Sequence, residues 1–331
     1  MLSRRARPTI RALVEDLDHG WSQPWPPRLL RTRDFDGLSP LSALPHPIVE
    51  KGADDIGEDP SQDNPVGSIA SSRTIPLLEI KTARWRGAVW SDPQSGSNWL
   101  IAAGIAKGGH QDHDDFYRRI ERAAESGLLE SWLPDEDDLR LLKRETAARI
   151  LYDFEIELQS LSTGALERAL KTGADAFSVP HPKSREQLAT VAVEIAQGDD
   201  AIETVIVEVD PAPQFRASAL AWTVAIRVLI TLWPPEQDWD PQSFTFSNML
   251  PSGSLASRLR RLTGICERKE LAESTPGSQS HYFHTPGILE SSVNGTAVKS
   301  LCGVYVVTRQ NPDGLPVCPE CTSRRAHLSD R

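Results

Sequence analysis

Cysteine and histidine gather at the C-terminal end of this chain of 331 residues. Three of its four cysteines lie beyond residue 300, and two of them form the pair Cys318-Pro-Glu-Cys321. A CxxC turn directs both sulfur atoms at one centre, and Cys302 with a histidine would complete a tetrahedral zinc site. His281 and His284 compete for the fourth position. The spacing therefore predicts that this end of the chain folds around a zinc ion.

The CxxC pair has two other interpretations, a redox motif and cysteines that only pack. A redox pair lies at a strand-to-helix junction of a thioredoxin-like fold, and the sequence around Cys318 predicts no such context. A complete set of three cysteines and one histidine leaves no open position for water, so the predicted zinc is structural and not catalytic. The remaining cysteine, Cys266, lies in a predicted basic helix and is expected to be a small buried side chain.

The composition narrows the class of protein. The formal net charge is −10, so contact with nucleic acid needs a local basic face. The clustered cysteines are not a disulfide scaffold and fit a reducing compartment. The longest apolar run, residues 217–233, is interrupted by Arg227 and followed by Pro234-Pro235, which argues against a membrane partner. No apolar stretch follows the basic N-terminus, and we expect a cytoplasmic protein.

The first half of the chain predicts a tail followed by a compact domain. Residues 1–72 combine low hydrophobicity with many Pro, Gly and Ser, which predicts a largely disordered tail. Residues 73–175 predict a β-meander plus helices. The expected elements are strands at 75–81, 84–90 and 98–104, and helices at 114–126, 135–159 and 164–172.

The second half predicts two more segments. Residues 184–270 form a mixed α/β segment, and the expected elements are a helix at 184–197, a strand at 203–210 and helices at 217–232 and 255–270. Residues 278–325 form a zinc ribbon, in which short strands flank Cys302-Gly303 and the turn Asn311-Pro-Asp-Gly314 leads back to the CxxC pair. The four segments together predict an α+β fold.

The C-terminal stretch also resembles a known family. The resemblance rests on His281-Tyr282, Glu290-Ser291, Val293, Gly295-Thr296, Leu301-Cys302-Gly303 and Pro316-Val-Cys-Pro-Glu-Cys321. This pattern is similar to that of small bacterial proteins of unknown function, found mainly in actinobacteria. The resemblance covers about fifty residues and implies the ligand set His281, Cys302, Cys318 and Cys321, with His281 favoured over His284. It implies no activity, because the family itself is uncharacterised.

A second resemblance concerns residues 74–125. Leu77-Leu-Glu-Ile-Lys81, Arg84-Trp-Arg86 and Asp114-Asp-Phe-Tyr117 are similar to the core of RelE/HigB-type toxins, small ribonucleases that cut messenger RNA on the ribosome. That chemistry needs no metal, but it needs cations at the transition state and a group that activates the ribose 2′-hydroxyl. The resemblance implies Arg84, Arg86 and Tyr117 as catalytic residues. The opposing interpretation is a solvated strand face with one packed tryptophan.

The predicted helix at 255–270 is basic and lies just before the zinc ribbon. Its Arg258, Arg260 and Arg261 either contact the phosphates of RNA or DNA or pair with acidic side chains of this chain. We therefore expect a protein with structural zinc that acts on or with nucleic acid or the translation machinery, in its sharpest form as a metal-independent ribonuclease. The competing hypothesis is a non-enzymatic module for a protein partner, held together by zinc because its core is small.

A second histidine cluster lies in the first compact domain. His110 and His113 have HxxH spacing, and Asp112, Asp114 and Asp115 add three carboxylates, a set that permits a divalent ion. Acidic residues also gather before helices, where they satisfy the positive end of the helix dipole. We favour this second interpretation, a polar loop that leads to a helix N-cap.

Overall fold

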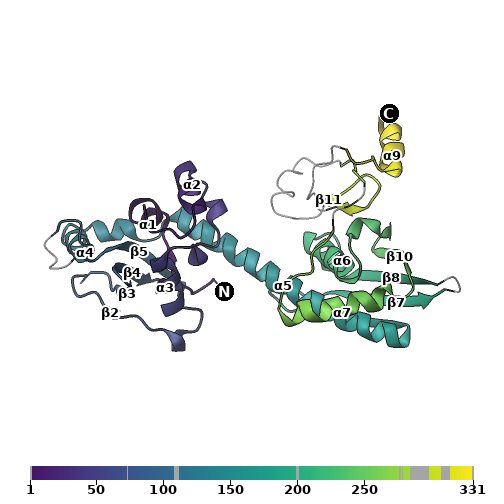
Figure 1. The fold of residues 1–331 in the computed structure, drawn as a ribbon, viewed down its shortest axis with the longest axis horizontal. Helices are drawn as coiled ribbons and strands as arrows, with labels where there is room; N and C mark the ends of the chain where they lie inside the picture. The colour runs from purple at the N-terminus through teal and green to yellow at the C-terminus, as the bar shows by residue number, and fades with distance from the viewer. Residues whose placement is uncertain are drawn as a thin grey trace. The chain divides into compact units, whose positions relative to one another are not determined.

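The computed structural model divides into two compact units, Met1–Arg149 and Ile150–Arg331. It describes residues 2–72, 74–107, 112–198, 201–275, 277, 279–283, 298–306 and 314–329. Each unit contains a five-stranded sheet with helices, so the predicted α+β class is confirmed (Figure 1). The finer division into four segments stays a prediction. None of the helices within the described ranges is long and apolar enough to cross a membrane.

The first unit is built on a sheet in the order β1-β5-β4-β3-β2. Its strands are β1 Arg7–Pro8, β2 Gly67–Ser68, β3 Leu78–Thr82, β4 Trp85–Ser91 and β5 Asn98–Ile105. The predicted meander is present, because β3, β4 and β5 pair antiparallel in chain order. The short strand β1 adds a parallel pair at the far edge of β5.

Helices cover the sheet of the first unit on both faces. They are α1 Ile10–Glu15, α2 Trp25–Thr32, α3 Pro47–Asp55, α4 Phe116–Glu125 and the first part of α5 Glu136–Thr172. Leu100 of β5 belongs to an apolar cluster with residues of α1 and α3, and Ile101 belongs to a second cluster with Phe116 and Ile120 of α4. Successive strand residues point to opposite faces, so β5 lies between two cores.

Residues 2–72 differ from the expected disordered tail. Leu13 and Ile48 in this stretch are fully buried, and Pro47 begins helix α3 instead of breaking a structure, as proline at the first helical position does. The residue before it, His46, accepts a hydrogen bond at Nδ1 from the backbone N–H of Ile48. The few apolar residues suffice because they pack on a sheet that later parts of the chain supply.

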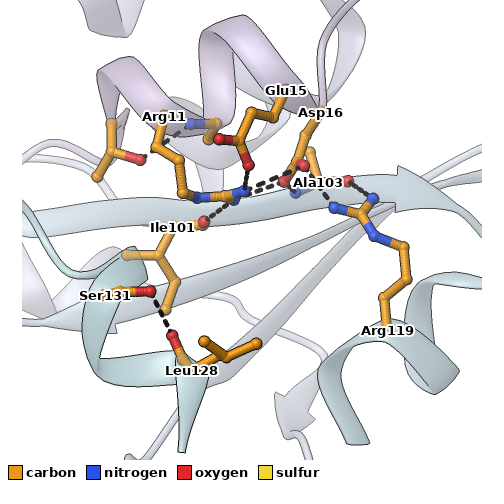
Figure 2. Close-up of polar contacts among 10 residues, drawn as sticks. Arg11, Glu15, Asp16, Ile101, Ala103, Arg119, Leu128 and Ser131 are labelled. Carbon is orange, nitrogen blue, oxygen red and sulfur yellow. Dashed lines mark hydrogen bonds and ion pairs between the residues drawn. The ribbon is translucent and has the colours of Figure 1, made fainter. Parts of the chain in front are cut away.

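A buried carboxylate joins three elements of the first unit. The side chain of Asp16, directly after α1, is inaccessible to solvent. It accepts hydrogen bonds from Nη2 of Arg11 at 2.8 Å, Nη2 of Arg119 at 2.5 Å and the backbone N–H of Ala103 at 2.9 Å (Figure 2). Buried charges persist when they are paired and fully hydrogen-bonded. Asp16 thus fixes α1 and α4 to strand β5.

A second buried ion pair ties the N-terminus to α5. Arg7 and Glu145 are 2.5 Å apart, and their side chains are 2% and 7% exposed. The other carboxylate oxygen of Glu145 accepts the backbone N–H of Leu41 at 2.7 Å. Burial lowers the pKa of Arg7 below its ordinary value, and the charge of Glu145 opposes that shift.

The second unit contains an antiparallel sheet in the order β6-β7-β8-β10-β9. Its strands are β6 Ala174–Pro180, β7 Gln187–Gln197, β8 Ile202–Pro211, β9 Asp240–Gln242 and β10 Thr245–Pro251. One apolar cluster joins β7 and β8 to α6 Ala219–Leu232, α7 Ser254–Glu267 and the later part of α5. Figure 1 shows α6 and α7 beside these strands.

Three predicted helices are corrected. The stretch 184–197 forms strand β7 and not a helix, because Val191 and Val193 pair with Val209 and Val207 of β8. The helices predicted at 135–159 and 164–172 are one continuous helix, α5. Gly164 lies inside it without ending it. Short 3-10 turns complete the fold at Asp36–Leu38, Leu41–Ala43, Pro60–Gln62, Leu128–Trp132, Pro213–Phe215 and Glu236–Asp238.

Candidate metal centre

The C-terminal part is built from short paired stretches. Strands β11 Val298–Lys299 and β12 Tyr305–Val306 pair antiparallel. Residues 280–283 run between two other stretches: Ser280 forms a parallel bridge with Val317, and Phe283 forms an antiparallel bridge with Ser300. His281 therefore lies on a segment that is paired on one side with the chain entering the CxxC motif and on the other with the chain entering Cys302.

Local backbone geometry positions the sulfur atoms. Cys302 lies in a tight turn in which the N–H of Ser300 bonds to the carbonyl of Val304 at 2.8 Å and Gly303 has φ of +97°, a conformation that favours glycine. Helix α9 Pro319–Ser329 begins inside the CxxC motif. The N–H of Thr322 bonds to the carbonyl of Cys318 at 3.1 Å, so both motif cysteines lie at the start of this helix.

The four predicted ligands come together. Nδ1 of His281 and the Sγ atoms of Cys302, Cys318 and Cys321 all lie within 4.8 Å of one another. Nδ1 of His281 is 3.4 Å from Sγ of Cys302 and 3.6 Å from Sγ of Cys321. With Zn–S bonds of about 2.3 Å and Zn–N bonds of about 2.0 Å, a tetrahedral site separates nitrogen from sulfur by about 3.6 Å. The cluster thus has the composition and spacing to hold a metal ion such as zinc.

The thiols respond to one another's charge. Burial raises the pKa of Cys302, but hydrogen bonds from the Ser300 hydroxyl and from the N–H of Val304 outweigh burial and leave this pKa below its ordinary value. For Cys318, burial raises the pKa, and the neighbouring charges on Cys302 and Cys321 raise it further. Several thiolates at this spacing repel each other unless a cation neutralises them, and a bound metal ion supplies that positive charge while its thiol ligands lose their protons.

The apolar core around the cluster is small. Among the described residues of 273–329, the buried side chains are Ser274, Val298, Ser300, Cys318 and Cys321. Two of the three apolar members of this set are thus candidate ligands. The apolar side chains buried among these described residues supply little hydrophobic stabilisation.

The structure corrects one detail of the predicted ribbon. The CxxC pair opens helix α9 and does not lie on a β-hairpin. Of the two histidines that compete for the fourth position, His281 lies in the cluster, and His284 lies outside the described residues. Sequence reasoning also missed Ser300, whose hydroxyl is 3.0 Å from Sγ of Cys302. No feature of the sequence marks this serine apart from its distance of two residues from a cysteine.

The residues predicted as catalytic are only partly brought together. Nε of Arg86 donates to the Tyr117 hydroxyl at 3.2 Å, and that hydroxyl donates to Glu79 at 2.7 Å. Burial and the bond to Glu79 raise the pKa of Tyr117, which opposes a role as a base. Arg84 lies in the exposed turn before β4 and not on the strand face of Arg86. These contacts hold the first turn of α4 to strands β3 and β4, and they give no support for a toxin-like core.

The predicted nucleic-acid contacts fall into two groups. Arg258 is buried, and it donates from Nε to the carbonyl of Thr231 at 2.9 Å and from Nη2 to that of Ile230 at 2.7 Å. Burial lowers its pKa to about 10. Arg258 therefore satisfies the last carbonyls of helix α6 and is unavailable to phosphates. Arg260 and Arg261 are exposed on α7.

The other histidine and cysteine candidates have structural contacts. Asp115 caps α4 by accepting the N–H of Tyr117 at 3.0 Å, and Asp112 pairs with Lys107 at 2.6 Å. The interpretation as a polar loop and helix cap agrees with these contacts; His110 lies outside the described residues. Cys266 is half-buried, and its Sγ accepts a weak hydrogen bond from Gln159 at 3.7 Å.

Comparison with known proteins adds one finding. The model of a family described as a protein of unknown function (DUF3039) matches residues 273–328, and we refer to this stretch as the metal domain. The match contains all four candidate ligands. No curated protein and no solved structure is significantly similar to the chain. The resemblance of the C-terminal part to an uncharacterised family is thus confirmed, and no activity comes with it.

Proposed function

We propose that the metal domain is a structural zinc module with His281, Cys302, Cys318 and Cys321 as its ligands. The observation that carries the proposal is the cluster itself, in which one nitrogen and three sulfur atoms lie within 4.8 Å of one another, while the described residues around it bury few apolar side chains. A closed set of four protein ligands is typical of zinc that holds a fold and not of zinc that activates water. The metal would then supply the folding free energy that the core does not.

Metal analysis of the full-length protein, purified without a histidine tag under reducing conditions, tests this proposal. We expect about one zinc per chain in the native protein. Cys321→Ser should lose most of that zinc, because it removes one of four ligands. Cys266→Ser is the matched control, since it removes a cysteine that lies outside the cluster, and it should keep the full zinc content.

The identity of the fourth ligand needs its own pair of variants. His281→Ala should lower the zinc content in the same way as Cys321→Ser, whereas His284→Ala should leave it unchanged. Cobalt substitution gives a second readout, because tetrahedral cobalt thiolate sites have characteristic visible absorption. Native protein that contains no stoichiometric metal and accepts no cobalt would sink the zinc proposal.

A second candidate function is contact with RNA or DNA through helix α7. The observation in its favour is that Arg260 and Arg261 are exposed and make no ion pair within the described part of the chain. In a chain with net charge −10, a pair of arginines without acidic partners is a plausible phosphate contact. Arg258 does not take part, because it is committed to α6.

Salt-dependent binding tests this second candidate. Labelled RNA and DNA are titrated with the native protein and with an Arg260→Ala/Arg261→Ala variant over a range of salt concentrations. Each lost phosphate contact should reduce the slope of log affinity against log salt by about 1. Arg185→Ala is the control, because Arg185 is an exposed arginine of the same unit that is paired with Glu157. If the double variant keeps the native slope, or no nucleic acid binds, the alternative of a zinc-held module for a protein partner takes its place.

A further inference from the structure

We propose that a cleft in the second unit binds a nucleoside monophosphate group. The cleft has a volume of about 520 Å³, within the range of roughly 300–1,000 Å³ that is usual for small-molecule sites. It is lined by Glu208, Val209, Asp210, Pro211, Arg216, Trp222, Ser243, Phe244, Thr245 and Lys299. Strand β8, helix α6, the turn before β10 and strand β11 contribute to it, and of these only β11 belongs to the metal domain.

An aromatic pair forms one wall of the cleft. The rings of Trp222 and Phe244 are stacked, with centroids 4.2 Å apart and planes inclined by 16°. Both side chains are half-buried and therefore keep part of their surface accessible. The carbonyl of Phe244 accepts the N–H of Val209 at 2.9 Å, which fixes the turn to β8. A rigid aromatic surface of this kind suits a planar heterocycle, because every nucleobase has a π-face that stacks on aromatic side chains.

Two cations lie next to this wall. Nζ of Lys299 is 5.5 Å from the centroid of the Trp222 ring. Arg216 is exposed, and its Nη2 is 3.6 Å from Oδ1 of Asp210, which is exposed as well. An exposed ion pair at that separation is weak, whereas a guanidinium binds phosphate through short charge-assisted hydrogen bonds. A phosphate on the ligand can therefore draw Arg216 from Asp210.

The two carboxylates restrict which anionic ligands can bind beside the two cations. Glu208 and Asp210 line the same cleft, so its formal charges balance. Carboxylates accept hydrogen bonds from ribose hydroxyls and from the amino groups of bases, and they repel a polyphosphate. The cleft therefore offers a partner for each part of the ligand. The aromatic wall suits the base, the two cations suit one phosphate, and the two carboxylates suit the ribose. Such a nucleoside monophosphate group comes either from a free mononucleotide or from the terminal nucleotide of a strand.

Isothermal titration calorimetry on the full-length protein tests the proposal. The free ligands are AMP, GMP, CMP and UMP, and a 5′-phosphorylated RNA pentamer represents the strand. We expect saturable binding of at least one of these ligands. Arg216→Ala and Lys299→Ala should each weaken it about tenfold or more, because each removes a charge-assisted contact. Phe244→Leu should weaken it too and leaves charge unchanged. Arg185→Ala is the control, because Arg185 is exposed, paired with Glu157 and absent from the cleft lining, and this variant should bind as the native protein does.

The outcomes separate the two sources and the two proposals. If free mononucleotides bind and the pentamer displaces them, the cleft recognises the nucleoside monophosphate group from either source. If only the pentamer binds, the ligand is the terminal nucleotide of a strand. No saturable binding of any ligand, or native affinity in both Arg216→Ala and Phe244→Leu, overturns the proposal. Both side chains lie outside the metal domain, so these two variants leave the four candidate zinc ligands in place. Protein that lacks zinc but binds through Arg216 would contradict only the zinc module.

Discussion

In the first unit, two apolar clusters pack against opposite faces of one sheet, and buried ion pairs at Asp16 and Glu145 tie the helices to it. The described part of the metal domain buries a handful of side chains, and its two buried cysteines are candidate ligands. The first arrangement draws its stability from many contacts that each contribute little. The second would draw it from four ligands around one metal ion, if the proposed zinc binds. The two regions should therefore unfold under different treatments, and this difference directly tests whether they are stabilised in different ways.

Removal of the metal should have the largest effect. Structural zinc contributes apparent free energies on the order of 10 kcal/mol in small zinc domains, so a strong chelator should unfold the metal domain and leave the first unit folded. Hydrogen exchange measured by mass spectrometry checks this. Amides in 298–306 and 314–329 should lose protection, whereas those in β4 and β5 should keep it. Equal loss in both regions would contradict the contrast.

Arg7→Ala should have the opposite effect: it should destabilise the first unit and leave the metal domain unchanged. It leaves Glu145 buried without its partner, and removal of one member of a buried pair costs about 3–5 kcal/mol. Urea unfolding of the first unit measures this change, and the zinc content should stay constant. Arg140→Ala is the control, because its pair with Asp137 is exposed and should contribute less than about 1 kcal/mol. Equal costs for the two variants would mean that the buried pair has no special role.

A smaller effect should appear in the pH dependence of the first unit. Burial raises the pKa of Asp138 to about 6, well above the ordinary value of an aspartate. Because the folded-state pKa is the higher one, this group stabilises the fold fully below about pH 4, and the contribution is lost as pH rises through 6. The change amounts to about 2–3 kcal/mol. Asp138→Asn should remove this slope between pH 4 and 6 in urea titrations. A native slope in that variant would show that another group titrates.

The smallest effect is expected for the exposed arginines of α7. Arg260→Ala/Arg261→Ala should change the free energy of unfolding by less than about 0.5 kcal/mol, as surface substitutions do. Arg258→Ala should cost more, because it leaves the last carbonyls of α6 without a donor. Thermal unfolding of the two variants compares them directly. A larger loss of stability in Arg258→Ala would separate its structural role from the surface position of Arg260 and Arg261.

The sequence predicts the meander and the ligand set well, and for physical reasons. Strands β4 and β5 have a strong local apolar signal, and a CxxC motif has its geometry built into four residues. Strand β7 was misassigned because Leu188, Val191 and Val193 fit helical and extended spacing almost equally. The choice depends on pairing with β8, which no local pattern contains.

Other features depend on distant parts of the chain. The positive charge of Arg258 suggests an exposed contact, but burial against the end of α6 decides its role. The cleft beside Trp222 combines residues from 208 to 299, and none of them forms a recognisable motif. The order of residues 2–72 likewise comes from β3, β4 and β5, which the chain reaches later. In each case the deciding partner lies too far along the sequence for a pattern to reveal it.

Strand β11 has a consequence for regulation. Lys299 of this strand faces the ring of Trp222, and Cys302 follows three residues later. If zinc orders the strand that presents Lys299, the two binding equilibria are linked, and linkage is reciprocal. Zinc would tighten the hold on the nucleotide, and the nucleotide would tighten the hold on zinc by the same factor. The occupancy of each site would then report on the supply of the other ligand.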